Sequence, residues 1–137
     1  MQEQWIKWEP VNGLIENYYV EYIFDGMDGL KIQLSEANNR KNKVNIIFED
    51  SVYAYRSTDE SFRQSTEFEL GKKYGDEFYF KWAFFKITDS SYLSWLSEQS
   101  YTITDSLSLK HFCFFAVDSV VDVVNDSDPK IEIIIEE

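Results

Sequence analysis

One stretch limits the fold of this 137-residue chain more than any other: residues 78–87 are almost continuously aromatic or aliphatic. Lys81 and Lys86 are the only interruptions. A strand with one face in water alternates between apolar and polar residues, whereas a strand covered on both faces is apolar throughout. The stretch therefore predicts a central strand with protein packed on both sides.

A short helix is predicted directly after this strand. Residues 89–91 offer three side-chain acceptors, which the unpaired amide groups of a first helical turn need. Four apolar residues fall within one arc of this helix: Tyr92, Leu93, Trp95 and Leu96. We expect the strand and the helix to form the structural centre of the protein, with Trp95 and Leu96 covering the core of the sheet.

The first half of the chain has the pattern of antiparallel β-structure. Residues 18–24 are aromatic or β-branched, and after a turn with two glycines residues 30–36 alternate between apolar and polar side chains. Residues 44–48 and 52–55 predict a second hairpin, and a polar loop with three bases over 38–43 precedes it. Four successive antiparallel strands form a meander, which is the shortest connection between them.

The N-terminal segment carries two tryptophans, Trp5 and Trp8, before Pro10. It predicts either a single helical turn or a short strand that the proline ends. Packing against the core is the ordinary role of such residues, and an exposed interaction patch is the alternative.

The second half of the chain supplies one more helix and three more strands. Residues 67–74 predict a helix that ends near Gly75. Strands are predicted over 110–117, 120–124 and 130–135. Residues 120–124 could also form a helical turn, but their density of valine favours a strand. These elements indicate one α+β domain over residues 1–137, mostly antiparallel sheet with one or two short helices.

Composition excludes several classes of protein. Hydrophobic residues make up 44% of the chain and aromatic residues 18%, which is far from the composition of disordered segments. The N-terminus lacks a basic segment followed by an apolar run, and no segment approaches the ~20 apolar residues of a membrane span. Cys113 is the single cysteine, so the chain cannot form an internal disulfide. We therefore expect a cytoplasmic protein.

The net charge of −12 indicates the kind of partner. Such a field repels nucleic acid and anionic membranes and speeds encounter with basic proteins. Residues 118–137 hold seven acidic residues and one basic residue, which is half of the net charge. One interpretation is solubility and charged outer faces of strands, and the other is a surface shaped for a cationic protein.

The residues that could carry catalysis are few. His111 and Cys113 lie two apart on a predicted strand, so they share a face and could act as base and nucleophile. The phenylalanines around them favour a core role instead, because an apolar setting raises the pKa of a thiol. One histidine and one cysteine fall short of the usual four zinc ligands, and the spaced acids match no calcium loop. We therefore expect no catalytic site, no metal and no cofactor.

The best local cluster of acids is Asp59 and Glu60, which lie between Arg56 and Arg63. Paired carboxylates can perform acid and base chemistry. A capped, ion-paired turn is the simpler interpretation of this cluster, since each acid has a base nearby in the chain.

Three groups of residues together resemble a family of small acidic bacterial proteins. They are residues 55–60, residues 91–100, and residues 111–129 with their valine run and terminal proline. The likeness extends over residues 14–135. Some members of this family are similar to immunity proteins, which are carried beside polymorphic toxins in Gram-positive bacteria and bind the toxin in the cytoplasm without catalysing a reaction.

The resemblance implies that this chain is such an immunity protein and that its partner is a basic toxin. An acidic surface would then occupy a cationic active site by charge complementarity. In one variant of this hypothesis the acids are spaced like the phosphates of a nucleic acid. The acids expected in this surface come from the end of the chain: Asp118, Asp122, Asp126, Asp128 and Glu132.

A different class of function stays open beside this one. Aromatic residues of the strands could line a cavity for a small molecule, in a binding protein or an enzyme. The tyrosines expected to line it are Tyr18, Tyr22, Tyr53, Tyr55 and Tyr79. A closed core with no cavity of roughly 300 Å³ or more would count against this alternative.

Overall fold

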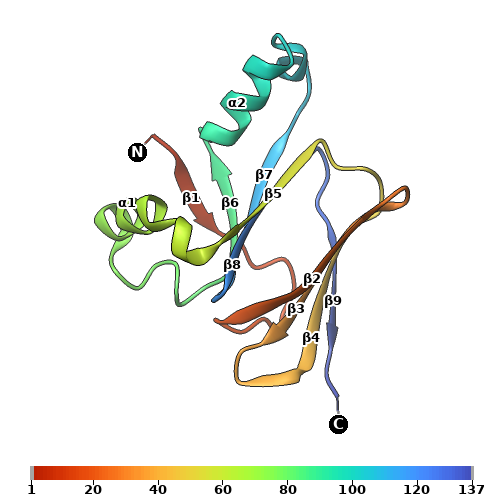
Figure 1. The fold of residues 1–137 in the computed structure, drawn as a ribbon, viewed down its shortest axis with the longest axis vertical. Helices are drawn as coiled ribbons and strands as arrows, with labels where there is room; N and C mark the ends of the chain where they lie inside the picture. The colour runs from red at the N-terminus through yellow and green to blue at the C-terminus, as the bar shows by residue number, and fades with distance from the viewer. Residues whose placement is uncertain (1, 137) are drawn as a thin grey trace.

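The computed structural model describes residues 2–136 and consists of two antiparallel sheets, one of which carries both helices (Figure 1). The strands are β1 (Gln4–Lys7), β2 (Tyr18–Gly26), β3 (Gly29–Glu36), β4 (Asn39–Phe48), β5 (Ala54–Asp59), β6 (Phe84–Thr88), β7 (Lys110–Phe115), β8 (Ser119–Asn125) and β9 (Lys130–Ile134). The helices are α1 (Gln64–Tyr74) and α2 (Ser91–Gln99), with 3-10 turns η1 (Glu60–Phe62) and η2 (Ile103–Ser106).

The strands divide into a five-stranded sheet of order β1-β6-β7-β8-β5 and a four-stranded sheet of order β2-β3-β4-β9. We call them sheet A and sheet B. All the pairings are antiparallel. The predicted α+β class, dominated by antiparallel sheet, is confirmed.

The main core lies between the two sheets. On sheet B the alternating residues Leu30, Ile32 and Leu34 of β3 face inward and are buried, as their sequence pattern predicts. On sheet A, Phe84 and Phe112 face them. Each large side chain buried in this way stabilises the fold by about 1.5–3 kcal/mol. The shared core makes the described residues a single folding unit.

A second core lies on the other face of sheet A, beneath α1. Leu70 of α1 packs with Trp5, Phe85 and Cys113, all buried. Strands β6 and β7 therefore have protein on both faces, which explains their continuous apolar sequences. Trp5 lies in strand β1, so the strand alternative for the N-terminal segment is the one that the structure adopts.

The predicted strand over residues 78–87 begins later than expected, at Phe84. Residues 76–80 form turns instead. Their rings still cover sheet A, since Phe78 lies 5.1 Å from the Phe85 ring and Tyr79 lies 5.2 Å from the Phe115 ring. The apolar run thus reflects burial in two kinds of structure, a packed turn and a central strand.

The predicted four-strand meander is wrong in its last strand. Strands β2, β3 and β4 form three of its members, but β5 pairs with β8 in sheet A, with Tyr55 opposite Val123. Strand β9 takes the place beside β4, where Ile131 and Ile133 pack against the main core. The basic segment expected as a loop over 38–43 also differs, because strand β4 already begins at Asn39.

Helix α2 begins as predicted, with Ser90 as its N-cap: the Leu93 amide donates to Ser90 Oγ over 3.2 Å. The expectation for Trp95 is wrong, because this side chain is 48% exposed and stacks on Tyr92 instead. Tyr92 takes the buried position against sheet A. No helix within residues 2–136 is long and apolar enough to cross a membrane.

Candidate functional site

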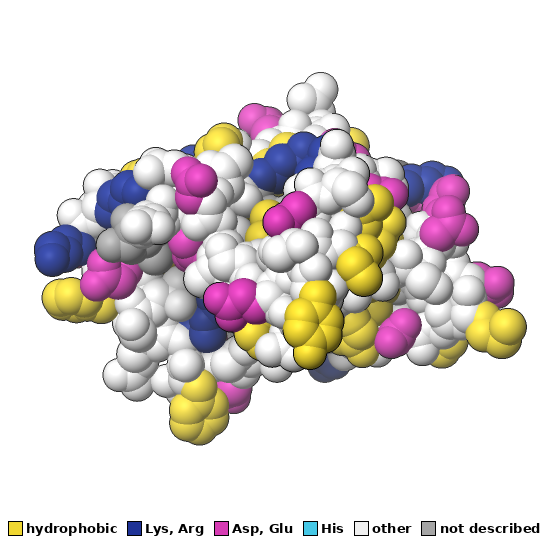
Figure 2. All heavy atoms as spheres, turned by 90° about the horizontal axis from the view of Figure 1, so that it is seen from above, with side chains coloured by type: hydrophobic (Ala, Val, Ile, Leu, Met, Phe, Trp, Pro, Cys, Tyr) yellow, Lys and Arg dark blue, Asp and Glu magenta, His cyan; other side chains and the backbone are white. Residues whose placement is uncertain are grey.

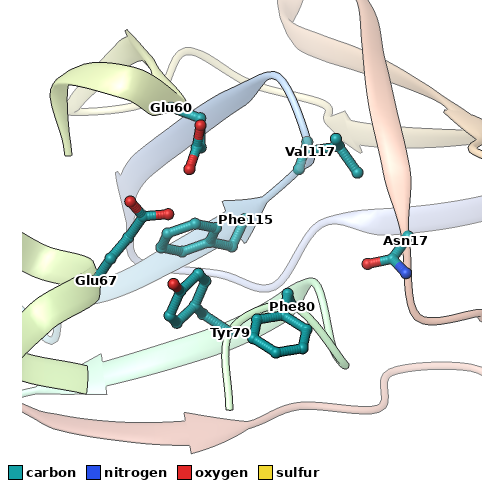
Figure 3. Close-up of a pocket in the computed structure, with 8 residues that line it drawn as sticks. Asn17, Glu60, Glu67, Tyr79, Phe80, Phe115 and Val117 are labelled. Carbon is teal, nitrogen blue, oxygen red and sulfur yellow. The ribbon is translucent and has the colours of Figure 1, made fainter. Parts of the chain in front are cut away.

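A cavity of about 350 Å³ lies where η1, the first turn of α1, the turn over 76–80 and the β7–β8 connection meet (Figure 3). Its walls are Asn17, Glu60, Glu67, Tyr79, Phe80, Phe115, Ala116 and Val117. A second hollow of about 610 Å³ shares Glu67, Tyr79 and Phe80 with it and adds Phe68, Gly71, Lys72 and Asp76. We call the two hollows together the acidic cleft.

Two carboxyl groups project into the cavity from consecutive helical segments (Figure 3). The Asp59 carboxylate caps η1 by accepting from the Ser61 amide over 2.9 Å, and the Glu60 amide donates to the Asp118 carbonyl over 3.1 Å. Glu67 lies in the first turn of α1, where its amide donates to the Arg63 carbonyl. These hydrogen bonds fix the main chain from which both carboxyl groups project.

Glu60 perturbs the titration of Glu67. Burial, a hydrogen bond with Glu60 and the Glu60 charge raise the pKa of Glu67 from 4.5 to about 7, and Arg63 opposes this rise. Arg63 does not neutralise the pair, because its guanidinium group donates to Asp122 over 2.9 Å. Near neutral pH, Glu67 is therefore protonated in some of the molecules and ionised in the others.

Aromatic rings form the opposite wall of the cavity. The Tyr79 ring lies 5.2 Å from Phe115 and 5.5 Å from Phe80, and its hydroxyl group points toward Glu67 (Figure 3). Burial, followed by the charges of Glu67 and Glu60, raises the pKa of Tyr79, so this hydroxyl stays protonated. Carboxylates facing aromatic rings are the surroundings that proteins use to bind organic cations.

Of the five tyrosines expected to line a cavity, only Tyr79 lines the acidic cleft. Tyr18 is buried in the main core, where its hydroxyl accepts from the Ile15 amide over 2.8 Å. Tyr22, Tyr53 and Tyr55 are all partly exposed and do not line the acidic cleft. The cavity is larger than the minimum expected for a small-molecule site, but four of the five expected tyrosines do not line it.

The expectation for Asp122 in an acidic surface is wrong, because this side chain is 0% exposed. Val120 and Val124 lie on the same face of β8 as Asp122, and Val120 belongs to the second core, so the carboxylate points to the helix-covered side of sheet A and not into the main core. Arg56 Nε donates to Asp122 Oδ2 over 2.8 Å, and Arg63 donates to the same oxygen. Asp122 therefore stabilises the interior and contributes nothing to the outer surface.

The remaining four acids of the expected surface are exposed but lie apart. Asp118 and Asp126 flank opposite ends of β8, ~25 Å apart along an extended strand. Asp128 is ion-paired with Lys86 and Lys110, and Glu132 lies on β9 in sheet B. Figure 2 likewise shows acidic side chains dispersed among apolar ones on one face of the molecule. Of the five expected acids, Asp118 alone is a chain neighbour of a residue that lines the acidic cleft, Val117, and its carboxylate accepts from the Val20 amide over 3.0 Å.

Asp122 also ends a buried chain of polar side chains. His111 Nε2 lies 2.7 Å from Asp122 Oδ1, and His111 Nδ1 lies 2.6 Å from Ser90 Oγ. Burial alone would raise the pKa of Asp122, but the His111 hydrogen bond and the two arginines outweigh it and hold that pKa well below its usual range. Ser90 is 3% exposed and caps α2, so it is closed to a substrate.

Cys113 and His111 share one face of β7, as the sequence predicts. Cys113 is 0% exposed, and burial followed by the nearby Asp122 charge raises the pKa of its thiol well above its usual value. The thiol is therefore protonated and shielded. Within residues 2–136, no group of three or more His, Cys, Asp or Glu side chains is placed to hold a metal ion.

The sequence singled out Glu60 and Tyr79 but missed Glu67, their partner in the cavity. Glu60 and Glu67 are seven residues apart, and a 3-10 turn followed by an α-helix brings them together. In one continuous helix, residues seven apart share a face but lie about 10.5 Å apart along the axis, too far for their carboxyl groups to interact directly.

No protein-family model matches this chain, and no curated protein and no solved structure matches it either. The resemblance to a family of small acidic bacterial proteins, some of them similar to immunity proteins, therefore stays a prediction.

Proposed function

We propose that this protein is a non-catalytic interaction protein that binds and neutralises a cationic protein, as an immunity protein neutralises a basic toxin. The observation that carries the proposal is the acidic cleft, in which Glu60 and Glu67 face the rings of Tyr79 and Phe80. A cationic partner gains charge complementarity and aromatic contact at one place. The partner-binding surface proposed from the structure is therefore the cleft together with Asp118, the chain neighbour of Val117.

The net charge of −12 supports the same proposal at longer range. An acidic protein attracts a basic partner over about one Debye length, roughly 8 Å at physiological ionic strength, and so raises the rate of encounter. We place the function in the cytoplasm, where a protein with one buried cysteine and no disulfide is stable in a reducing environment.

A second candidate function is the binding of a small molecule, in a receptor or an enzyme. The cavity of about 350 Å³ favours it, because pockets for small ligands begin at roughly 300 Å³. A neutral metabolite that binds the cleft with micromolar affinity, and that displaces no protein partner, would support this candidate over the first.

The test is co-expression with the product of the neighbouring gene, which the proposal expects to be a toxin. We expect the protein to restore growth and to co-purify with the toxin in a complex that weakens as salt rises, because salt screens the charges. The double variant Glu60→Gln and Glu67→Gln should lose at least about tenfold in affinity, in line with removing charges from a complementary interface. Glu98→Gln makes the same change at an exposed position of α2 and serves as the control. Failure to bind or protect against any adjacent toxin would remove the proposal.

A further inference from the structure

We infer that the acidic cleft binds one arginine side chain of the cationic partner, between its carboxyl pair and its aromatic wall. This inference rests on the proposed function and adds the chemical group that the cleft recognises. Both carboxyl groups line the smaller part of the cleft, the cavity of about 350 Å³, which lies at the lower end of the range for ligand pockets and can hold one long side chain.

Arginine fits these walls better than lysine does. Its guanidinium group is flat, so it can stack on a ring while its N–H groups donate to carboxylate oxygens in the same plane. The cleft offers both partners, since Glu60 and Glu67 lie on one side and the rings of Tyr79 and Phe80 on the other. The ammonium group of lysine could use the charge but not the flat stacking surface.

The protein already uses this combination once, inside its own fold. The guanidinium carbon of Arg56 lies 4.3 Å from the centre of the Tyr92 ring, while Arg56 Nε donates to Asp122 over 2.8 Å. Arg56 is thus held by a tyrosine face and a carboxylate together. The acidic cleft presents the same two kinds of group, a tyrosine ring and carboxylates, at the surface.

Binding of arginine should release a proton. Glu60, Arg63 and Tyr79 interact with Glu67 electrostatically, and the charged residues Lys72 and Asp76 line the same hollow. Because the pKa of Glu67 is about 7, a large share of the molecules carry its proton at neutral pH. A guanidinium group beside the pair favours two ionised carboxylates, so the proton leaves to the solvent. Affinity should therefore rise about tenfold between pH 6 and pH 8, as expected for one proton released from a group of this pKa.

The test uses two small probes, Nα-acetyl-arginine methylamide and its uncharged isostere Nα-acetyl-citrulline methylamide. Binding is followed by NMR through the ring signals of Tyr79 and Phe80. We expect the arginine probe to shift these signals at millimolar concentration, to bind at least tenfold more tightly than the citrulline probe, and to bind more tightly at pH 8 than at pH 6. Glu67→Gln should weaken binding and abolish its pH dependence, whereas Glu98→Gln should change neither.

Equal binding of the two probes, or shifts that leave Tyr79 and Phe80 unchanged, would overturn the inference. So would equal binding of the matching lysine probe. A toxin that binds normally to Glu67→Gln would also overturn it while leaving the proposed function intact. Arginine-probe binding with the predicted pH dependence would support the cleft as a guanidinium site even if no adjacent toxin bound, and the proposed function alone would then fail.

Discussion

His111 Nε2 and Asp122 Oδ1 lie 2.7 Å apart in the interior of the protein, on the adjacent central strands β7 and β8. The contact joins more than two strands. His111 reaches α2 through Ser90, while Asp122 reaches β5 through Arg56 and the start of α1 through Arg63. One buried carboxylate therefore connects both helices to sheet A. Loss of this carboxylate should therefore weaken the packing of both helices on sheet A.

Asparagine has nearly the same shape as aspartate but carries no charge, so Asp122→Asn tests the contribution of the charge alone. The amide oxygen of the asparagine could still accept from His111, but the guanidinium groups of Arg56 and Arg63 would lose their counter-charge. Removing one partner of a buried ion pair costs about 3–5 kcal/mol. We expect Asp122→Asn to lower the free energy of unfolding by about that amount in urea denaturation followed by circular dichroism.

Asp126→Asn is the matched control for this change. Asp126 follows the same strand, is exposed and accepts only a long hydrogen bond of 3.4 Å from the Tyr53 hydroxyl among the contacts described. Exposed substitutions of this kind usually change stability by less than about 0.5 kcal/mol. Equal losses for the two variants would show that the buried network does not stabilise the fold.

Leu70 should be the residue that attaches α1 to sheet A. It is the buried residue of this helix and packs in the second core with Trp5 and Phe85. Leu70→Ala removes this contact and leaves a cavity, which typically costs about 2–5 kcal/mol. Phe68→Ala, on the exposed side of the same helix, should cost far less. Urea unfolding of both variants measures the difference, and similar values would place the helix attachment elsewhere.

The fold was predictable where local sequence carries the physical cause. Continuous apolar sequence identified β7, alternation identified β3, and Ser90 was among the predicted caps of α2. These features depend on burial and capping within a few residues. The transfer of β5 to sheet A was not predictable in this way, because its partner Val123 lies 68 residues beyond Tyr55. No pattern in either strand specifies that pairing.

The same difference holds for the acidic residues: the position of one could be predicted from nearby sequence, and that of the Glu60–Glu67 pair could not. Asp122 had a local signal, since the residues two positions before and after it are valines and strands place such residues on one face. Counting charge alone hid that signal and assigned Asp122 to the surface. The Glu60–Glu67 pair had no comparable signal, because its geometry depends on how η1 meets α1.

Cys113 should be inert in the folded protein. The side chain is buried, and burial raises the pKa of its thiol, so both access and the reactive thiolate are lacking. We expect a thiol reagent such as Ellman's reagent to label Cys113 in urea but not in native buffer. In Ser94→Cys, which adds an exposed thiol on α2, native buffer should label one thiol per chain and urea should label two. Rapid native labelling of Cys113 would contradict the packing of the second core.

Glu67 should make the protein less stable as the pH rises toward neutrality. Burial and Glu60 raise its pKa from 4.5 to about 7, so the folded state binds this proton more tightly than the unfolded chain does. The stabilisation is complete below pH 4.5 and is lost as the pH rises through about 7.

The carboxyl group is only part buried, so solvent screening reduces the effect, and we expect a loss of about 1 kcal/mol between pH 5 and pH 8. Glu67→Gln cannot lose a proton and should remove this part of the pH dependence, whereas Glu98→Gln should follow the wild-type curve. Urea denaturation at the two pH values gives the change in the free energy of unfolding for the wild type and for each of the two variants. If this change were the same in Glu67→Gln as in the wild type, Glu67 would not hold the proton in the folded state. The expected pH dependence of arginine binding would then lose its physical basis.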